Sequence, residues 1–450
     1  MRRREFLKVL GTGAGLSALP AACRRVAAPT PTATPTPAAV ASPTVGPTPG
    51  VSPTVAVAPT PTVRPAAVTI TWSVQSFAHQ ALQPFLDEFK ALTGITVRLE
   101  SGPATGQDLM TQLIPAFSSG TTPFDVVDVD DPASEAFIAA GWLEPLDDAL
   151  EPNFWNDFPP SMLDATKTWN QSGGETFRIY HNWELGYFWY RKDILDDLGL
   201  SVPQTWDDLV NVGKEARARK QMWGFADAAA KPGLTFVYLA YIVAQTGGNL
   251  YESDKGTRRG FEFAHELLYT HQIFPQDALT WTYDQLNNAY MQDQLLTMRE
   301  WTFFWDVAKA NTQWYSPEKV SITVPPAGPG GSKTWAGGWS WAIPRFTKNK
   351  DAAKEFIRYI SSAEIAPKLA RASSFFVTSR NSVMSELGGE GITQYMKLYT
   401  DRGVVTPRPY HKQSAKAESI IDEIGQAYLT NQIDLDQAMA QGRQRIAALG

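Results

Sequence analysis

The chain has 450 residues, 43% of them hydrophobic, which is enough for two or three domains with sizeable cores. The composition predicts a globular chain rather than a disordered one. The formal net charge is −6, and it becomes more negative once the basic first segment is set aside. This balance argues against nucleic acid as a partner.

The first residues have the character of an export signal. Three consecutive arginines at 2–4 precede FLK at 6–8, and a weakly apolar run rich in Gly and Ala follows at 9–22. That run is too short to span a bilayer as a stable helix. RREFLK at 3–8 resembles the twin-arginine export signal, and an ordinary Sec signal is the alternative. Both interpretations take the protein out of the cytoplasm.

The only cysteine, Cys23, stands where the apolar run ends and has no internal disulfide partner. LPAAC at 19–23 resembles a bacterial lipobox, although Pro20 replaces the usual Leu or Val. The alternative is cleavage after a small residue, with Cys23 lost or left as a free thiol. We expect a signal peptide at 1–23 and lipidation of Cys23, which would anchor the protein at the outer face of the cytoplasmic membrane.

Residues 24–66 consist almost wholly of Pro, Thr, Ala, Val, Ser and Gly, with Thr-Pro repeated. Such a segment has too little apolar surface to fold and favours extended polyproline conformations. At roughly 3.1 Å per residue it could reach on the order of 100 Å from a membrane anchor. We therefore expect a disordered linker that serves as a tether.

Strand and helix patterns alternate after this linker, which is typical of an α/β fold. Apolar residues predict strands at 68–72, 95–99 and 124–129. Leu and Phe recur at helical spacing over 82–89 and 109–117, between these strands.

The same alternation continues through the second half of the chain. A buried strand is predicted at 186–191, and Thr205 with Asp208 forms a capping-box pattern that predicts the start of a helix. A strand at 339–343 and a helix at 353–360 follow.

Four blocks stand in a fixed order along the chain. They are FDVVDVDDPASEAFIAAGWLEPL at 124–146, GYFWYRKDILDDLGLSVPQTWDDL at 186–209, GGWSWAIPRFTKNKDAAKEFIRYI at 337–360, and the last helix at 434–449. The blocks resemble those of the family 1 extracellular solute-binding proteins. Four blocks in the family's order make coincidence improbable.

The resemblance implies an α/β fold of the two-lobed periplasmic-binding-protein kind, type II. Each lobe would be a mostly parallel sheet flanked by helices, and a hinge would join them. The first lobe would comprise 67–182, with about 299–340 returning to it. The second would comprise 183–298, with about 341–450 largely completing it.

Chain crossovers between the lobes are expected near 179–186 and near 296–299, with another after Trp339. Ligands in such folds bind between the lobes, where the carboxyl ends of strands and the N-termini of helices meet. The resemblance thus places the ligand site in the cleft beside the hinge.

By the same resemblance, the protein would capture a carbohydrate, an oligosaccharide in our expectation, and deliver it to the permease subunits of an ABC importer. A monomer is the family's usual state, and neither a cofactor nor a metal is expected. The five histidines lack the paired spacing of a zinc site, and no G-x-S-x-G or Walker A motif occurs. A non-sugar solute and a tethered carbohydrate-active enzyme remain alternatives.

Aromatic side chains stack on the apolar face of a sugar ring, while carboxylates accept hydrogen bonds from hydroxyl groups. Trp339 follows two glycines that allow close backbone approach, and Asp130 follows a predicted strand. Asp131 could instead cap the next helix, and any aromatic in a strand could belong to the core. A surface ion pair would explain Arg380 equally well, and packing would explain Tyr410. The candidate ligand residues are Asp130, Asp131, Asn182, Trp183, Trp281, Trp301, Trp305, Trp339, Trp341, Arg380 and Tyr410.

Overall fold

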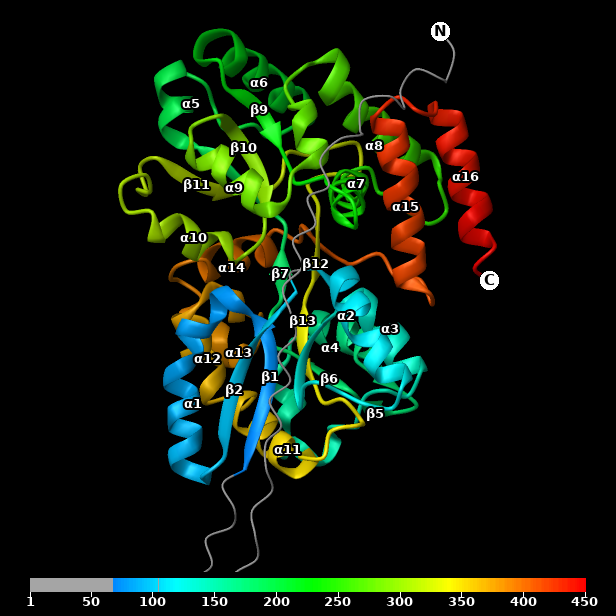
Figure 1. Ribbon diagram of the computed structural model, residues 1–450. Coiled ribbons are helices and arrows are strands. Elements are labelled where there is room, and N and C mark those ends of the chain that lie inside the picture. The colour runs from blue at the N-terminus through cyan, green and yellow to red at the C-terminus, as the bar shows by residue number, and fades with distance from the viewer. Residues whose placement is uncertain (1–67, 104) are drawn as a thin grey trace, which may run out of the picture. The chain divides into compact units, whose positions relative to one another are not determined.

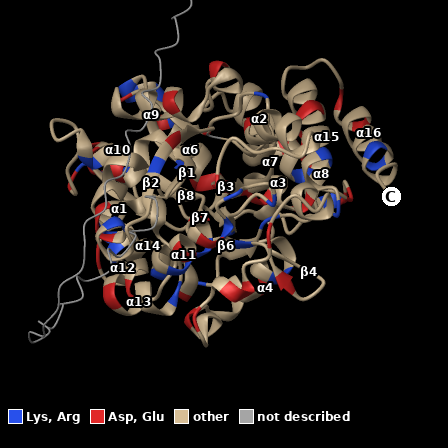
Figure 2. Cartoon of the chain, turned by 60° about the horizontal axis from the view of Figure 1, so that its bottom comes forward, with Lys and Arg blue, Asp and Glu red and all other residues tan. Residues whose placement is uncertain are grey.

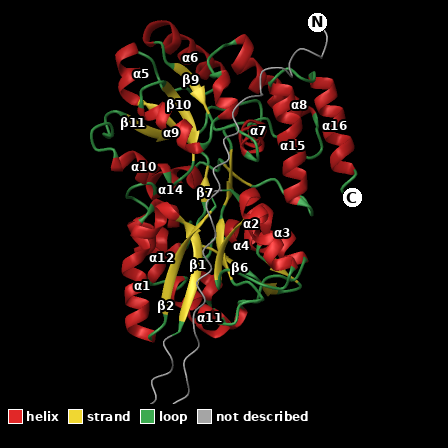
Figure 3. Ribbon diagram, viewed as in Figure 1, coloured by secondary structure: helices red, strands yellow, loops and turns green. Residues whose placement is uncertain are grey.

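Two β-sheets organise residues 68–103 and 105–450, which are the residues that this computed structural model describes. Each sheet is flanked by helices and forms the centre of one lobe (Figures 1 and 3). The predicted signal peptide, the linker and Cys23 lie outside the described residues. In the described part, no helix is both long and apolar enough to cross a membrane.

The first lobe contains a five-stranded sheet. Its strands, in spatial order, are β2 (Thr96–Gly102), β1 (Thr69–Gln75), β3 (Val126–Asp130), β13 (Trp339–Ala342) and β6 (Arg178–Tyr180). Its helices are α1 (His79–Thr93), α2 (Gly106–Ser118), α3 (Asp131–Ala139), α4 (Pro160–Trp169), α11 (Lys350–Ile360), α12 (Ile365–Ala372) and α13 (Asn381–Leu387). A short hairpin of β4 (Gln171–Ser172) and β5 (Glu175–Thr176) follows α4.

The second lobe contains a four-stranded sheet. Its order is β11 (Val320–Thr323), β8 (Tyr187–Arg191), β10 (Leu295–Glu300) and β9 (Trp223–Ala226). Its helices are α5 (Lys192–Leu198), α6 (Trp206–Lys220), α7 (Leu234–Ala244), α8 (Lys255–His265), α9 (Tyr283–Met291), α10 (Phe304–Ala310), α15 (Ser414–Leu429) and α16 (Leu435–Ala447). Basic and acidic positions are interspersed along the elements of both lobes (Figure 2).

A third, three-stranded sheet marks where the chain passes between the lobes. Its strands are β14 (Val405–Pro407), which follows α14 (Thr393–Asp401), then β12 (Thr334–Gly337) and β7 (Glu184–Leu185). The crossover at β7 lies inside the predicted segment 179–186. The crossover predicted near 296–299 is wrong, because those residues belong to β10 inside the second sheet. After Trp339 the chain stays in the first lobe through α13, whereas Tyr399 of α14 contacts Phe188 and Thr323 of the second sheet.

The lobe boundaries also differ from the predicted ones. β11 lies within 299–340, which was assigned to the first lobe, but it pairs with β8 in the second. Helices α11 to α13 lie within 341–450 but pack on the first lobe. The reason is visible in α11, whose buried Phe356 lies 5.5 Å from the ring of Trp72 in β1 and 5.2 Å from that of Phe89 in α1.

In each sheet one strand runs opposite to the others. These strands are β13 in the first sheet, antiparallel to β3 and β6, and β8 in the second, antiparallel to β10 and β11. Both strands follow a crossover and therefore run away from the space between the lobes. The remaining strands run toward it, so their carboxyl ends meet there.

The helix start predicted from a capping pattern is confirmed. Thr205 and Asp208 form the predicted capping box at the start of α6. Gly94 ends α1 in a left-handed conformation, with φ of 80°. The α/β class and the two lobes were thus readable from the periodicity and from the family resemblance.

Candidate functional site: the cleft between the lobes

A cleft of about 750 Å³ lies between the lobes beside the three-stranded sheet. Strand ends of both lobes reach it, with Gln75 from β1, Asp130 from β3 and Trp301 directly after β10. Glu184 in β7 contributes from the hinge itself. The volume falls within the range typical of small-molecule sites.

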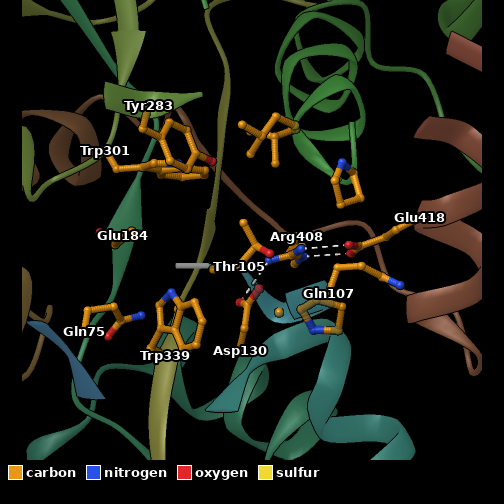
Figure 4. A pocket seen from close by; sticks show the side chains of 18 of the residues that line it. Gln75, Thr105, Gln107, Asp130, Glu184, Tyr283, Trp301, Trp339, Arg408 and Glu418 are labelled. Carbon is orange, nitrogen blue, oxygen red and sulfur yellow. Dashed lines mark hydrogen bonds and ion pairs between the residues drawn. The ribbon is translucent and has the colours of Figure 1, made fainter. Parts of the chain in front are cut away.

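Aromatic side chains line the cleft from both sides. Figure 4 shows Trp301 and Tyr283 above and Trp339 below, with Glu184 between the two levels. The ring of Trp335 meets that of Trp301 edge-on, with centroids 5.0 Å apart. The cleft therefore has flat apolar surfaces on two opposite walls.

A buried ion pair holds the upper aromatic wall. The Arg299 guanidinium lies 4.4 Å from the centre of the Trp301 ring. Arg299 Nε and Nη2 donate to the two carboxylate oxygens of Asp227, at 2.8 and 2.7 Å, and both residues are buried. Because this bidentate pair fixes the guanidinium plane, it also fixes the surface on which Trp301 rests.

A second network crosses the cleft from one lobe to the other. Arg408, which directly follows β14, donates from Nε and Nη2 to the carboxylate of Glu418 in α15, each at 2.9 Å. Its Nη1 lies 3.4 Å from Oδ1 of Asp130. Burial raises the pKa of Asp130, and the charge of Arg408 opposes that rise. Asp130 also caps α3, where Oδ1 accepts from the backbone N–H of Asp131 at 2.8 Å.

Asp131 is a buried structural residue that does not line the cleft, and it is not the N-cap. Its Oδ1 accepts from Arg178 Nη2 and from the Tyr180 hydroxyl, each at 2.8 Å. Its Oδ2 accepts from the backbone N–H of Gly338 at 3.0 Å. Asp131 therefore holds the residue that precedes Trp339, and so positions the lower aromatic wall.

Glu184 lies at the back of the cleft, and only 9% of its surface is exposed. Its Oε1 has no hydrogen-bond partner among the described residues. Burial raises the pKa of this carboxyl to about 8, and the negative charge of Asp130 adds to the rise.

Of the eleven residues predicted from sequence, the structure places Asp130, Trp301 and Trp339 on the cleft wall. The other eight do not line it. Trp341 belongs to the core beside Trp72, with ring centroids 6.4 Å apart. Asn182 is fully buried and donates from Nδ2 to the carbonyl of Phe375 at 2.6 Å.

The remaining predicted residues also pack against or pair with residues away from the cleft. Trp183 is buried with its ring edge-on to Tyr180, centroids 5.1 Å apart, and Trp305 packs against Tyr395 at 5.9 Å. Arg380 Nε donates to Asp157 at 2.7 Å, and this ion pair is largely buried, whereas the sequence left open one at the surface. Tyr410 lies edge-on to Trp169, and Trp281 is partly buried against both lobe cores.

The sequence analysis missed most residues of the cleft wall, among them Glu184, Tyr283, Arg408 and Glu418. Glu184 directly follows the predicted Trp183, and Tyr283 lies two residues after the predicted Trp281, so the correct segments were found without the correct side chains. Arg408 likewise lies two residues before the predicted Tyr410, but Glu418 had no signal, because the partnership of the two residues depends on how β14 and α15 meet. Among residues 68–103 and 105–450, no three His, Cys, Asp or Glu side chains gather as a metal site.

The comparisons with known proteins agree with this architecture. Residues 75–367 match the model of the bacterial extracellular solute-binding protein family. A probable ABC transporter-binding protein of Deinococcus radiodurans is 25% identical over 221 residues, which are 46% of this chain and 52% of that protein. The chain thus spans about half the length of that relative.

Two further similarities extend over more of the chain. The erythritol/L-threitol-binding protein of Mycolicibacterium smegmatis is 25% identical over 345 residues, 68% of each protein. The structure of maltose-bound MalE3 of T. maritima superimposes with a TM-score of 0.77 at 22% identity, covering 85% of this chain and all of that one. With a family match over more than half of its length and this two-lobed fold, the chain belongs to the bacterial extracellular solute-binding proteins.

Proposed function

We propose that this protein is the substrate-binding component of an ABC importer and that it captures a carbohydrate, specifically an oligosaccharide, in the cleft between its lobes. The observation that carries the proposal is the pair of facing aromatic walls, with Trp301 and Tyr283 on one lobe and Trp339 on the other. Closure of the lobes would bring these walls onto opposite faces of a sugar ring.

The polar groups of the cleft suit a polyol. A sugar ring offers axial C–H groups to an indole and hydroxyl groups at its rim. Asp130 and Gln75 lie near Trp339 and can accept or donate hydrogen bonds at that rim. The charge of Arg408 is already matched by Glu418, which leaves no strong attraction for an anionic ligand.

The relatives support the same ligand class. One binds erythritol or L-threitol, and one solved structure of the same fold holds maltose. The size of the cleft, about 750 Å³, favours more than one sugar residue. Delivery to a permease, anchoring through Cys23 and a monomeric state complete the proposal, and they rest on the family and on the N-terminal sequence.

A thermal-shift screen of residues 67–450 tests the ligand class. The panel is maltotriose, maltose, erythritol, spermidine and ferric citrate, since a solute at 100 times its Kd stabilises the fold by about 2.7 kcal/mol. We expect a selective shift with one or more of the carbohydrates. A shift with spermidine or ferric citrate alone would contradict the carbohydrate proposal and leave the binding-protein assignment intact.

Variants then locate the site. Trp301→Ala and Trp339→Ala should each abolish the shift. Trp305→Ala is the matched control, because Trp305 is an aromatic of the same type that does not line the cleft. Equal loss in all three variants would contradict the site. Chromatography of the bound sugar after incubation checks turnover, and recovery of intact sugar is expected for a binding protein.

A further inference from the structure

The carboxyl of Glu184 occupies an unusual place in the cleft. β7 pairs with β12, with Glu184 opposite Gly337, so the backbone of Glu184 is fixed within the hinge. Its side chain lines the cleft between the two aromatic levels, and the residue is nine-tenths buried. A buried acid aimed into a ligand cleft without a protein partner for Oε1 requires a physical account.

No described cation is available to hold Glu184 as a carboxylate. Among the described residues, Glu184 forms no ion pair within 4.0 Å. The nearest guanidinium that acts on it, Arg299 of β10, is engaged by both oxygens of Asp227. Arg408 is likewise engaged by Glu418.

The other titratable neighbours oppose ionisation. Asp130 at the end of β3 raises the pKa of Glu184, to about 8 together with burial. Glu300 of β10 and Tyr187 of β8 are also buried, and each has its own pKa raised by burial and by the charge of Glu184. The side chain of Asn182 opposes the rise in the pKa of Glu184, but it supplies no positive charge. A carboxylate without a cation among aromatic rings and further acids would be destabilised, whereas the neutral acid has an O–H group to donate.

We propose that Glu184 remains uncharged in the cleft at neutral pH and donates its carboxyl O–H to an oxygen of a neutral, polyhydroxylated ligand. This inference deepens the proposed function and rests on it. It assigns the ligand a hydrogen-bond acceptor, such as a hydroxyl or ring oxygen, at the level between Trp301 and Trp339.

The first test needs no ligand. Between pH values of about 4.3 and 8, the folded protein would bind a proton at Glu184 that the unfolded chain lacks. The unfolding equilibrium constant of the wild type should therefore gain a factor of ten per pH unit relative to Glu184→Gln, and the ratio should become constant above pH 8. Urea unfolding from pH 5 to 9 measures this ratio. A ratio that does not change with pH would overturn the inference.

The second test follows the affinity for maltotriose and erythritol from pH 6 to 10 by titration calorimetry. The wild type should bind with constant affinity up to about pH 7 and lose affinity tenfold per pH unit above about pH 8, because only the protonated fraction is competent. Glu184→Gln should bind at every pH, since its amide also donates, and Glu184→Ala should bind weakly throughout. Glu300→Gln is the matched control, a neighbouring buried acid outside the cleft lining, and it should keep the wild-type profile.

The outcomes separate this inference from the proposed function. Affinity for either sugar that rises with pH and disappears in Glu184→Gln would show a carboxylate that accepts hydrogen bonds from hydroxyl groups, and the inference would be wrong. Binding of spermidine but of neither sugar would contradict the carbohydrate proposal. In that case the urea experiment still decides whether Glu184 is uncharged.

Discussion

The ring of Phe77 stacks on that of Phe303, with centroids 5.7 Å apart and 29° between the planes. Phe77 lies directly after β1 of the first lobe, and Phe303 lies after β10 of the second, so the stack joins the two lobes beside the cleft that both residues line. Phe375 of the first lobe meets Phe77 edge-on at 5.0 Å. Although 53% of Phe77 is exposed, its ring has a defined role in holding the lobes together.

We expect Phe77→Ala to shift the ligand-free protein toward a more open arrangement. An aromatic pair contributes about 0.5–1.5 kcal/mol, which corresponds to roughly a twofold to tenfold change in the equilibrium between the arrangements. Small-angle X-ray scattering should show a larger radius of gyration for the variant, and the affinity for any ligand should fall by a similar factor. Leu92→Ala, an exposed apolar residue on α1, is the control. An unchanged radius with a ligand-dependent loss of affinity would instead assign Phe77 to direct ligand contact.

Arg408→Ala should destabilise the fold strongly. It leaves the buried carboxyl group of Glu418 and the partly buried one of Asp130 without their shared cation, and breaking a buried pair typically costs about 3–5 kcal/mol. Urea denaturation measures the loss. Adding Glu418→Gln to Arg408→Ala should recover part of it, because the amide carries no charge to bury. Arg445→Ala in α16 removes an exposed pair to Glu423 of α15 and should change stability little.

Asp131→Asn tests whether this residue is structural. The substitution removes the charge that matches the fully buried Arg178, so a loss of about 3–5 kcal/mol is expected. It also weakens the contact to Gly338 that positions Trp339, and the near-ultraviolet circular dichroism should change with it. Asp164→Asn, at an exposed pair with Lys167, should leave both measurements near wild type. If Asp131→Asn had normal stability but reduced ligand affinity, Asp131 would instead be assigned to the ligand site.

The sequence predicted the elements of the fold better than their assignment to lobes. Capping residues and periodicity are local properties, so the helix start at Thr205 could be read directly. The placement of β11 could not, because it depends on pairing with β8, about 130 positions away in the chain. A strand's partner is decided by tertiary packing, which a single sequence does not display.

For the site residues too, the sequence predicted local properties better than those that depend on tertiary packing. Trp339 and Trp341 share one face of β13. Both were predicted to contact ligand because both are tryptophans and lie in the same segment of the chain. Only Trp339, at the first position of the strand, reaches the cleft, whereas Trp341 lies deeper in the core beside Trp72. The distance of each tryptophan from the cleft, measured along β13, decides whether it contacts ligand or belongs to the core. This distance becomes known only when the crossover at β12 is located. Arg408 and Glu418 are 10 positions apart and meet only through the packing of α15.

Gly338→Ala tests the close approach of two crossovers. A Cβ at Gly338 would lie 2.1 Å from the carbonyl oxygen of Asn182, a backbone atom that cannot rotate away. The two segments would have to separate, which would displace Trp339 and weaken the contact from Asp131 to the backbone of Gly338. We therefore expect a lower melting temperature and loss of the ligand-induced thermal shift.

The matched control is Gly389→Ala, because nothing lies within 4 Å of a Cβ at that position. It should unfold near the wild-type temperature and keep the ligand response. If Gly338→Ala behaved like this control, the crossovers would have enough freedom to absorb a methyl group. The placement of Trp339 would then depend on the side chains around it rather than on the closeness of the two backbones.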